Sequence, residues 1–237
     1  GGRSGIRGYC KREKPAFRPP GLLAHDIYTI SRYINGPIFV VGDLRQSGDE
    51  YAYEALEGLR RYAIKNPVVL ELFKPADKTF FEAVARSISQ VNFEFSPESH
   101  LETVRRFSGK MYSNEEIEAT ISAALQSGCK KFDLFFMIGL PRQTPGDALA
   151  SVDYCRILLQ RFGKRLNPFI SPLAPFIDPG SLAYEQSEKL GYKIFYRTLE
   201  EYRQALLQPS WKYTLGYETE WMSREEIVST TYEAALR

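Results

Sequence analysis

The sequence predicts an α/β fold, a partial (β/α) TIM-like barrel with parallel strands and a helical C-terminal extension. The first observation behind this prediction is a rhythm in which short apolar segments alternate with longer amphipathic ones, as in βαβ units with right-handed crossovers. The second is that several apolar segments end abruptly in small and polar residues, which is typical of buried parallel strands that deliver groups to a site. We therefore expect the strands to pair in parallel and in sequence order.

Five apolar segments bounded by turn-forming residues are predicted as strands. A closed barrel of eight units typically needs about 250 residues, so an open or partial barrel is the expected product of this chain. The predicted strands are 37–41, 68–73, 91–95, 132–138 and 167–173.

The helices between the strands are predicted from apolar residues at helical spacing and from end signals. Asn35-Gly36 ends the first helix and Ser127-Gly128 ends the fourth. The segment 104–116 is predicted as a loop that enters the fourth helix, with Ser113 as a candidate N-cap and Glu116, three positions on, completing a capping box. The predicted helices are 22–34, 49–64, 78–88, 115–125 and 147–162, followed by helical segments near Leu190, at 196–207 and at 223–236, with no clear sixth strand.

Length and composition indicate an ordinary packed protein. The 237 residues are 43% apolar and 25% charged, enough for one large α/β domain or two small ones. We expect an irregular segment over 1–20, the partial barrel over 21–180 and the helical extension over 181–237. The net charge of +2 gives no electrostatic case for nucleic acid or a membrane surface, and no apolar run approaches the roughly 20 residues that span a bilayer. Three widely spaced cysteines favour a reducing compartment, so the cytoplasm is expected.

Candidate site residues follow from the predicted topology, because parallel strands place their carboxyl ends at one edge of the sheet. The first strand ends in Gly42-Asp43, the third leads into 96–99, and the fourth ends in Gly139-Leu140-Pro141. Glycine permits close approach of a ligand to the backbone, and a carboxylate can take an ammonium group. Each of these short motifs is also ordinary turn chemistry, which is the alternative interpretation.

These residues and their order resemble the radical S-adenosylmethionine (SAM) superfamily. Gly42-Asp43 stands where that family has its amino-group motif, Glu98-Ser99 where it has ribose and carboxylate contacts, and Gly139-Leu140-Pro141 with Thr144 matches its Gly-Leu-Pro-x-x-Thr motif. The resemblance covers roughly residues 20–175. It implies that Asp43 receives the amino group of SAM, that Glu98 and Ser99 contact the ribose or carboxylate, and that the Gly139-Leu140 backbone contacts adenine. The SAM-binding residues that it implies are Gly42, Asp43, Ser96, Glu98, Ser99, Gly139, Leu140 and Pro141, with no catalytic residue identified and no metal ligand.

The sequence departs from the family at the iron–sulfur cluster. A [4Fe–4S] cluster in this family needs a Cys-x3-Cys-x2-Cys motif, and Cys10, Cys129 and Cys155 are too far apart to form one. The segment 1–5 resembles the glycine-rich stretch that follows the last cluster cysteine in some members, often those of a cobalamin-dependent subgroup. We therefore expect the first barrel strand and the cysteine triad to lie upstream of Gly1, and this fragment neither to assemble the cluster nor to hold any cofactor tightly.

For the intact parent, the resemblance implies an enzyme with SAM, a [4Fe–4S] cluster and, through an upstream domain, cobalamin. Such an enzyme reductively cleaves SAM to a 5′-deoxyadenosyl radical or transfers a methyl-type group, with a reductant such as flavodoxin or ferredoxin. The substrate, small or macromolecular, is not identified by the sequence. Two alternatives remain open: a non-catalytic barrel-type binding or interaction domain, and a metal-independent α/β barrel enzyme.

Other chemistry-bearing residues have structural interpretations. Cys129 and Cys155 are expected in the core and His25 on a helix, whereas His100 follows a strand end and is a candidate to face the site. The aromatic residues of the C-terminal region line a substrate pocket or pack in the core. The basic residues between Arg3 and Lys14 lack aromatic neighbours for base stacking beyond Tyr9 and Phe17, so nucleic-acid binding is not expected.

Overall fold

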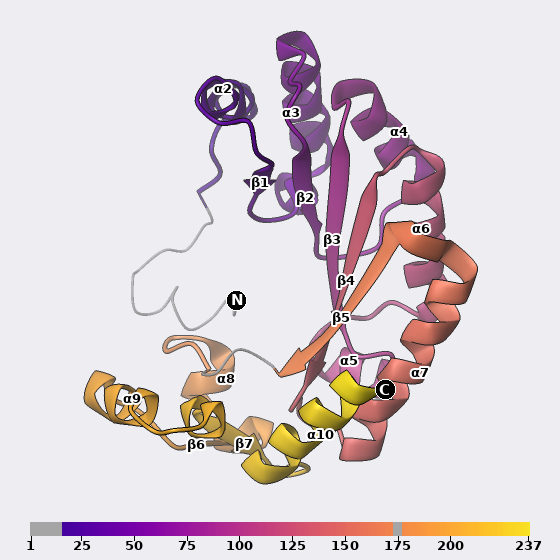
Figure 1. Cartoon of the computed structure of the whole chain (residues 1–237). Coiled ribbons are helices and arrows are strands. Elements are labelled where there is room, and N and C mark those ends of the chain that lie inside the picture. The colour runs from indigo at the N-terminus through magenta and orange to yellow at the C-terminus, as the bar shows by residue number, and fades with distance from the viewer. Residues whose placement is uncertain (1–15, 173–176) are drawn as a thin grey trace.

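The computed structural model describes residues 16–172 and 177–237. Its centre is a five-stranded parallel sheet in the order β1-β2-β3-β4-β5 (Figure 1). Every neighbouring pair is parallel, so the prediction of parallel strands in sequence order is confirmed. The strands are β1 (Ile38–Val40), β2 (Val68–Leu72), β3 (Val91–Glu98), β4 (Lys131–Ile138) and β5 (Leu166–Pro172).

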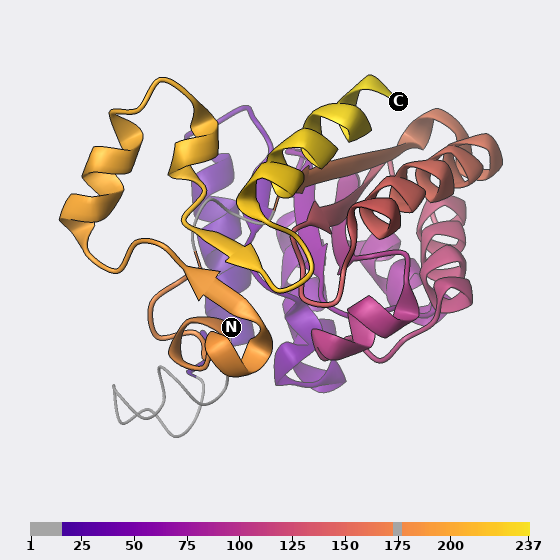
Figure 2. The same ribbon diagram turned by 90° about the horizontal axis from the view of Figure 1, so that it is seen from below.

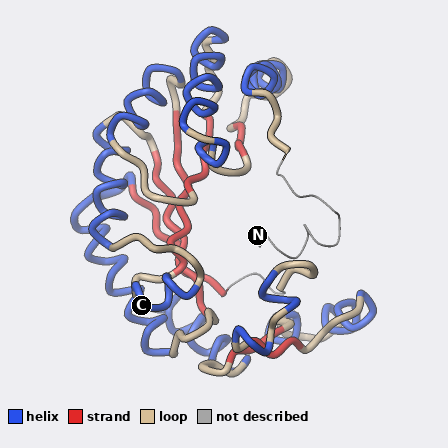
Figure 3. Tube along the Cα trace, turned by 180° about the vertical axis from the view of Figure 1, so that it is seen from behind, coloured by secondary structure: helices blue, strands red, loops and turns tan. Residues whose placement is uncertain are grey.

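Helices cover one face of this sheet, and its other face is concave, as the trace in Figure 3 shows. The helices α3 (Asp49–Tyr62), α4 (Lys78–Ser87), α6 (Asn114–Gln126) and α7 (Pro145–Phe162) form the outer layer, while α2 (Pro20–Ser31) packs on α3 near β1. All five lie where the sequence predicts helices. The structure also has a six-residue helix, α5 (Glu102–Phe107), within the segment predicted as a loop, and short 3₁₀ turns η1 (Leu44–Ser47) and η2 (Gly163–Arg165).

The main core fills the space between the sheet and the outer helices. Side chains of β2 and β3 alternate, so that Val68, Leu70 and Leu72 are buried against helices while Val69 and Glu71 face the concave side. The rings of Phe81, Phe93 and Phe132 contact one another in this layer. Each such fully buried side chain contributes about 1.5–3 kcal/mol to folding. This packing fixes which strand residues face the concave side.

Strand β3 continues three residues beyond its predicted end, through Ser96-Pro97 to Glu98. Its register against β4 shifts between Phe95 and Glu98, and Glu98 has a positive φ of 71°. Positive φ is strained for a residue with a side chain, and such irregularities re-aim side chains at strand ends. The polar, turn-like composition of Ser96, Pro97 and Glu98 does not predict a strand.

The C-terminal segment is helical, as predicted, but it also contains a small antiparallel sheet of β6 (Tyr192–Ile194) and β7 (Tyr217–Thr219), which the sequence analysis missed. Three-residue strands carry too little alternation to detect. Figure 2 shows this pair beside the helices of the segment. Those helices and turns are α8 (Leu182–Glu185), η3 (Glu188–Leu190), α9 (Leu199–Leu206), η4 (Trp211–Thr214) and α10 (Arg224–Leu236).

A second core cluster joins the C-terminal segment to the end of β4. It contains Ile138, Tyr192, Tyr217 and Ile227, and α10 packs on α7 and β5. A side chain at Gly139 would lie 2.9 Å from the Tyr217 hydroxyl and 3.0 Å from Ile227. Core packing therefore accounts for Tyr192 and Tyr217, one of the two interpretations of the C-terminal aromatic residues. No helix among the described residues is long and apolar enough to cross a membrane.

Candidate functional site

The carboxyl ends of β1 to β5 meet at one edge of the sheet, and the C-terminal segment lies beyond the ends of β4 and β5 (Figure 1). Gly42-Asp43 follows β1, the segment 96–99 ends β3, and Gly139-Leu140-Pro141 follows β4. The topology thus brings the motifs from three strands to the same edge. Their side chains, however, differ in whether they are free to bind a ligand.

Glu98 and Lys110 form a polar pair at the end of β3. Lys110 Nζ lies 2.9 Å from Glu98 Oε1 and also donates to the Ser96 carbonyl. Both side chains are about one-fifth exposed, at 19% for Lys110 and 20% for Glu98. An ammonium has three N–H donors and a carboxylate has two acceptor oxygens, so each partner keeps binding capacity for a ligand. Lys110 is not among the site residues predicted from the sequence, because the segment around it is predicted only as a loop before a capped helix.

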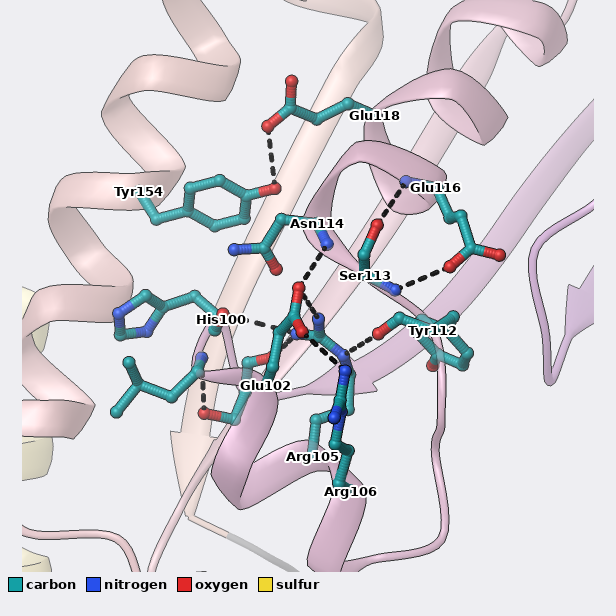
Figure 4. A network of polar contacts seen from close by, with 12 residues as sticks. His100, Glu102, Arg105, Arg106, Tyr112, Ser113, Asn114, Glu116, Glu118 and Tyr154 are labelled. Atoms are coloured by element: carbon teal, nitrogen blue, oxygen red, sulfur yellow. Dashed lines mark hydrogen bonds and ion pairs between the residues drawn. The ribbon is translucent and has the colours of Figure 1, made fainter.

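Arg105 organises the chain that follows β3 (Figure 4). Its side chain is fully buried and donates to the carbonyls of Tyr112, Ser99 and His100. The Ser99 hydroxyl, also fully buried, accepts from the Leu101 N–H. Ser99 is therefore occupied by local structure, and Arg105 ties the loop that carries Lys110 back to the end of β3.

The capping box predicted at the start of α6 is present. The Ser113 hydroxyl accepts from the Glu116 N–H, and the Glu116 carboxylate accepts from the Ser113 N–H (Figure 4). This box fixes the far end of the Arg105-bound loop. Both ends of the segment that carries Lys110 are thus anchored.

Asp43 is buried and saturated by contacts within the protein. Its carboxylate accepts from the Arg45 N–H, from Arg45 Nε at 2.9 Å and from the Arg45 terminal nitrogen at 2.6 Å, and from the Phe73 N–H at 3.0 Å. Arg45 in turn donates to the carbonyls of Lys74 and Pro75. An incoming amino group would have to displace Arg45. The role suggested for Asp43 stays a prediction, and its geometry favours a structural ion pair.

The turn at 139–141 is closed by Gln143, which is completely buried. The Gln143 side-chain oxygen accepts from the N–H groups of Gly139 and Leu140, and its amide donates to the Met137 carbonyl. Gly139 has a φ of 87°, which favours glycine, and Leu140 and Pro141 are buried. The N–H groups of Gly139 and Leu140 are therefore bonded within the protein and are not available to a ligand.

Gly42 has a φ of 93°, and its N–H donates to Glu71 Oε2 at 2.8 Å. Glu71 is the residue of β2 whose side chain lies on the concave side beside the end of β1. Glu71 is not among the site residues predicted from the sequence, because it lies inside a predicted strand rather than after it.

His100 faces α7 rather than the carboxyl edge. Its Nδ1 lies 2.9 Å from the Ser151 hydroxyl, and its ring is 6.0 Å from that of Tyr154. Burial, with a smaller effect from the Arg105 charge, lowers the pKa of His100 below its usual value, although Asp147 acts in the opposite direction. A neutral imidazole packed between the sheet and α7 fits a structural role.

The described cysteines do not fit a [4Fe–4S] cluster. Cys129 lies buried before β4 and Cys155 is buried on α7, and burial raises their pKa values to about 11 and about 12. A cluster ligand must be a thiolate, which such environments disfavour. Within residues 16–172 and 177–237, no group of three or more His, Cys, Asp or Glu residues could hold a metal ion. Cys10 lies outside the described residues.

Comparison with known proteins defines the class of fold. No protein-family model and no curated protein matches the sequence. Among solved structures, the chain is similar to the radical SAM methyltransferase TsrM from Kitasatospora setae with cobalamin and a [4Fe–4S] cluster bound, with a TM-score of 0.61 and 13% identity over 92% of this chain. The TsrM structure with tryptophan and a SAM analogue bound gives a TM-score of 0.58 and 14% identity over 76% of this chain. The chain has the fold of radical SAM enzymes.

The likeness covers only part of the relatives. The chain spans 46% of the length of the first TsrM structure and 36% of the second. The resemblance to radical SAM proteins inferred from the sequence motifs is confirmed at the level of the fold. Which residues contact SAM is a separate question, since identity this low shows the fold alone.

Proposed function

We propose that this chain is the SAM-binding barrel portion of a radical SAM enzyme. The observation that carries the proposal is the Glu98–Lys110 pair, which stands at the carboxyl edge of a radical SAM fold, on the strand beside the one that ends in Gly139. In parallel α/β folds, ligands bind at this edge. Because the solved structures with this fold are radical SAM enzymes, the fold supports an enzyme as the parent protein rather than a domain that only binds a partner.

The donor set at this edge suits the polar end of SAM. Lys110 offers a cationic donor for a carboxylate, and Glu98 offers an acceptor for ribose hydroxyls or an ammonium. The half-buried Ser96 lies on the same strand end. We assign binding to these groups in preference to Asp43 and Ser99, whose side chains are buried and hydrogen-bonded within the protein.

A bound [4Fe–4S] cluster would supply the electron that cleaves SAM, but the described residues do not fit that cluster. The role proposed for these residues is therefore limited to binding SAM and orienting it. For the whole protein we propose radical cleavage of SAM or transfer of a methyl-type group, with an electron-transfer protein such as a flavodoxin or ferredoxin as partner. Cobalamin is a cofactor of the TsrM structure, and its use by the parent of this chain is part of the same proposal.

Titration calorimetry with S-adenosylhomocysteine tests the binding role. We expect millimolar affinity at best, because without a cluster the remaining hydrogen bonds contribute only about 0.5–1.5 kcal/mol each. Replacing Glu98 by Gln or by Ala should weaken binding by about five- to tenfold, which corresponds to one hydrogen bond to a charged group. Lys110→Gln should act in the same direction.

Glu50→Gln is the matched control, because Glu50 is an exposed carboxylate at the start of α3. It should leave the affinity unchanged. Wild-type protein that does not bind S-adenosylhomocysteine at all would contradict the proposal and favour a barrel with another ligand. Equal S-adenosylhomocysteine affinity of the wild type and the Glu98 variants would show that Glu98 does not contact the ligand.

A further inference from the structure

The concave face of the sheet carries a row of polar side chains deeper than the proposed SAM edge. Glu71, Glu94, Asp133 and Asn167 are register partners on the adjacent strands β2, β3, β4 and β5. Neighbouring strands lie about 4.8 Å apart, so these side chains form one line across the sheet. Their alternate neighbours are buried against the helices, which leaves the row on the concave side.

The three carboxylates of this row differ in how far neighbouring groups offset their charge. Asp133 accepts from Asn167 and pairs with Lys131 at 3.0 Å, and Glu71 accepts from the Gly42 N–H. Glu94 makes no hydrogen bond or ion pair with any described residue. Burial raises the pKa of Glu94, and the nearby charges of Asp133 and Glu71 raise it further, while the Lys131 ammonium acts in the opposite direction. Among the described residues, the row sets three carboxylates against one ammonium and so favours a cation.

An aromatic pair lies next to this row, toward the carboxyl edge. Phe135 and Phe169 are register partners, and their rings stack with centroids 4.8 Å apart and an angle of 9°. Phe169 is 39% exposed, so part of the stack is open, and the Lys131 ammonium lies over the Phe169 ring, 5.9 Å from its centroid. Along β4, Phe135 is two residues beyond Asp133, a separation of about 6.6 Å.

We propose that this concave surface binds an aromatic amine as the substrate class of the site. The ring of the ligand packs on the Phe135–Phe169 pair, and its ammonium pairs with Glu94. That the amine is a substrate rests on the proposed function. That this surface binds an amine is inferred from the geometry alone. Along β4, the ring pair lies about 13 Å and the carboxylate row about 20 Å from Gly139, so the amine would bind below a SAM molecule held at the edge.

Charge and ring surface together select this ligand over simpler ones. An anionic ligand would meet uncompensated carboxylates, and a purely apolar ligand would bury Glu94 without a partner, which is costly. An amine without a ring would leave the stacked phenylalanines exposed. Aromatic rings prefer offset-stacked or edge-to-face contacts, both of which an open pair of rings permits.

Titration of the full chain with three probes, followed by NMR or calorimetry, tests the proposal. We expect 2-phenylethylamine to bind. The probe n-butylamine lacks the ring and should bind at least about tenfold more weakly. The probe 3-phenylpropionate keeps the ring but carries a negative charge, and it should not bind. Glu94→Gln and Phe169→Leu should each weaken 2-phenylethylamine by about five- to tenfold. Glu82→Gln, on the outer helix α4, should have no effect.

Equal binding of the three probes, or unchanged 2-phenylethylamine binding by Glu94→Gln, would overturn the proposal. The outcome is independent of S-adenosylhomocysteine binding. If the amine binds but S-adenosylhomocysteine does not, the proposed function fails and this site stands. If S-adenosylhomocysteine binds but the amine does not, the proposed function stands and the assignment of an aromatic amine is wrong.

Discussion

Replacing Arg105 by alanine is expected to cause a large loss of stability, about 3–5 kcal/mol of unfolding free energy. The substitution removes a fully buried cation that donates to the carbonyls of Tyr112, Ser99 and His100. Each buried acceptor left without a donor costs about 1–3 kcal/mol, and the cavity adds to this. Urea denaturation followed by circular dichroism measures the change.

Arg106→Ala is the matched control for this prediction. Arg106 is the next residue of α5, is 55% exposed and pairs only with Glu102 among the described residues. Exposed ion pairs of this kind contribute about 0–1 kcal/mol, so the control should unfold close to the wild-type midpoint. Equal destabilisation by the two substitutions would show that Arg105 does not organise the loop as described.

Asp43→Ala is expected to destabilise the protein by about 3 kcal/mol or more, because it leaves the buried Arg45 without its carboxylate. The paired side chains are only 2% and 6% exposed. The effect should appear as a lower urea midpoint for unfolding. Removing both partners in Asp43→Ala/Arg45→Met should cost less than the sum of the single substitutions, because no unpaired charge then remains.

This prediction also separates the two roles considered for Asp43. If Asp43 is a structural ion-pair partner, the destabilisation is large, and S-adenosylhomocysteine affinity, measured where the variant is folded, changes little. A variant of wild-type stability that loses S-adenosylhomocysteine binding would instead support the role in receiving an amino group, and would contradict a structural role for the Asp43–Arg45 ion pair.

Much of the fold could be predicted because its strands are continuous apolar runs with clear end signals. The strands predicted at 68–73 and 132–138 agree with the observed bounds of β2 and β4 to within one residue at each end. The end of β3 could not be predicted, since Ser96, Pro97 and Glu98 have a polar, turn-like composition and their extended conformation depends on pairing with β4. Strands β6 and β7 form through packing against the C-terminal core rather than through local pattern.

The sequence places the candidate motifs at one sheet edge, but it does not show which of their side chains are free to bind a ligand. Parallel topology is enough to place Asp43, Glu98 and Gly139 at one edge. Which carboxylate is free depends on side chains that fold back from elsewhere: Arg45 occupies Asp43, whereas Lys110 leaves Glu98 partly open. Such pairings are tertiary contacts, and a single sequence does not specify them.

Hydrogen–deuterium exchange with and without saturating S-adenosylhomocysteine directly tests whether the carboxyl edge of this sheet binds SAM. We expect slower exchange in peptides that cover 96–112 and 139–144, which carry Glu98, Lys110 and the Gly139 turn. Peptides from the outer helices α3 and α4 should exchange at unchanged rates. Protection confined to those outer helices, or absent from both edge segments at saturation, would contradict SAM binding at this edge.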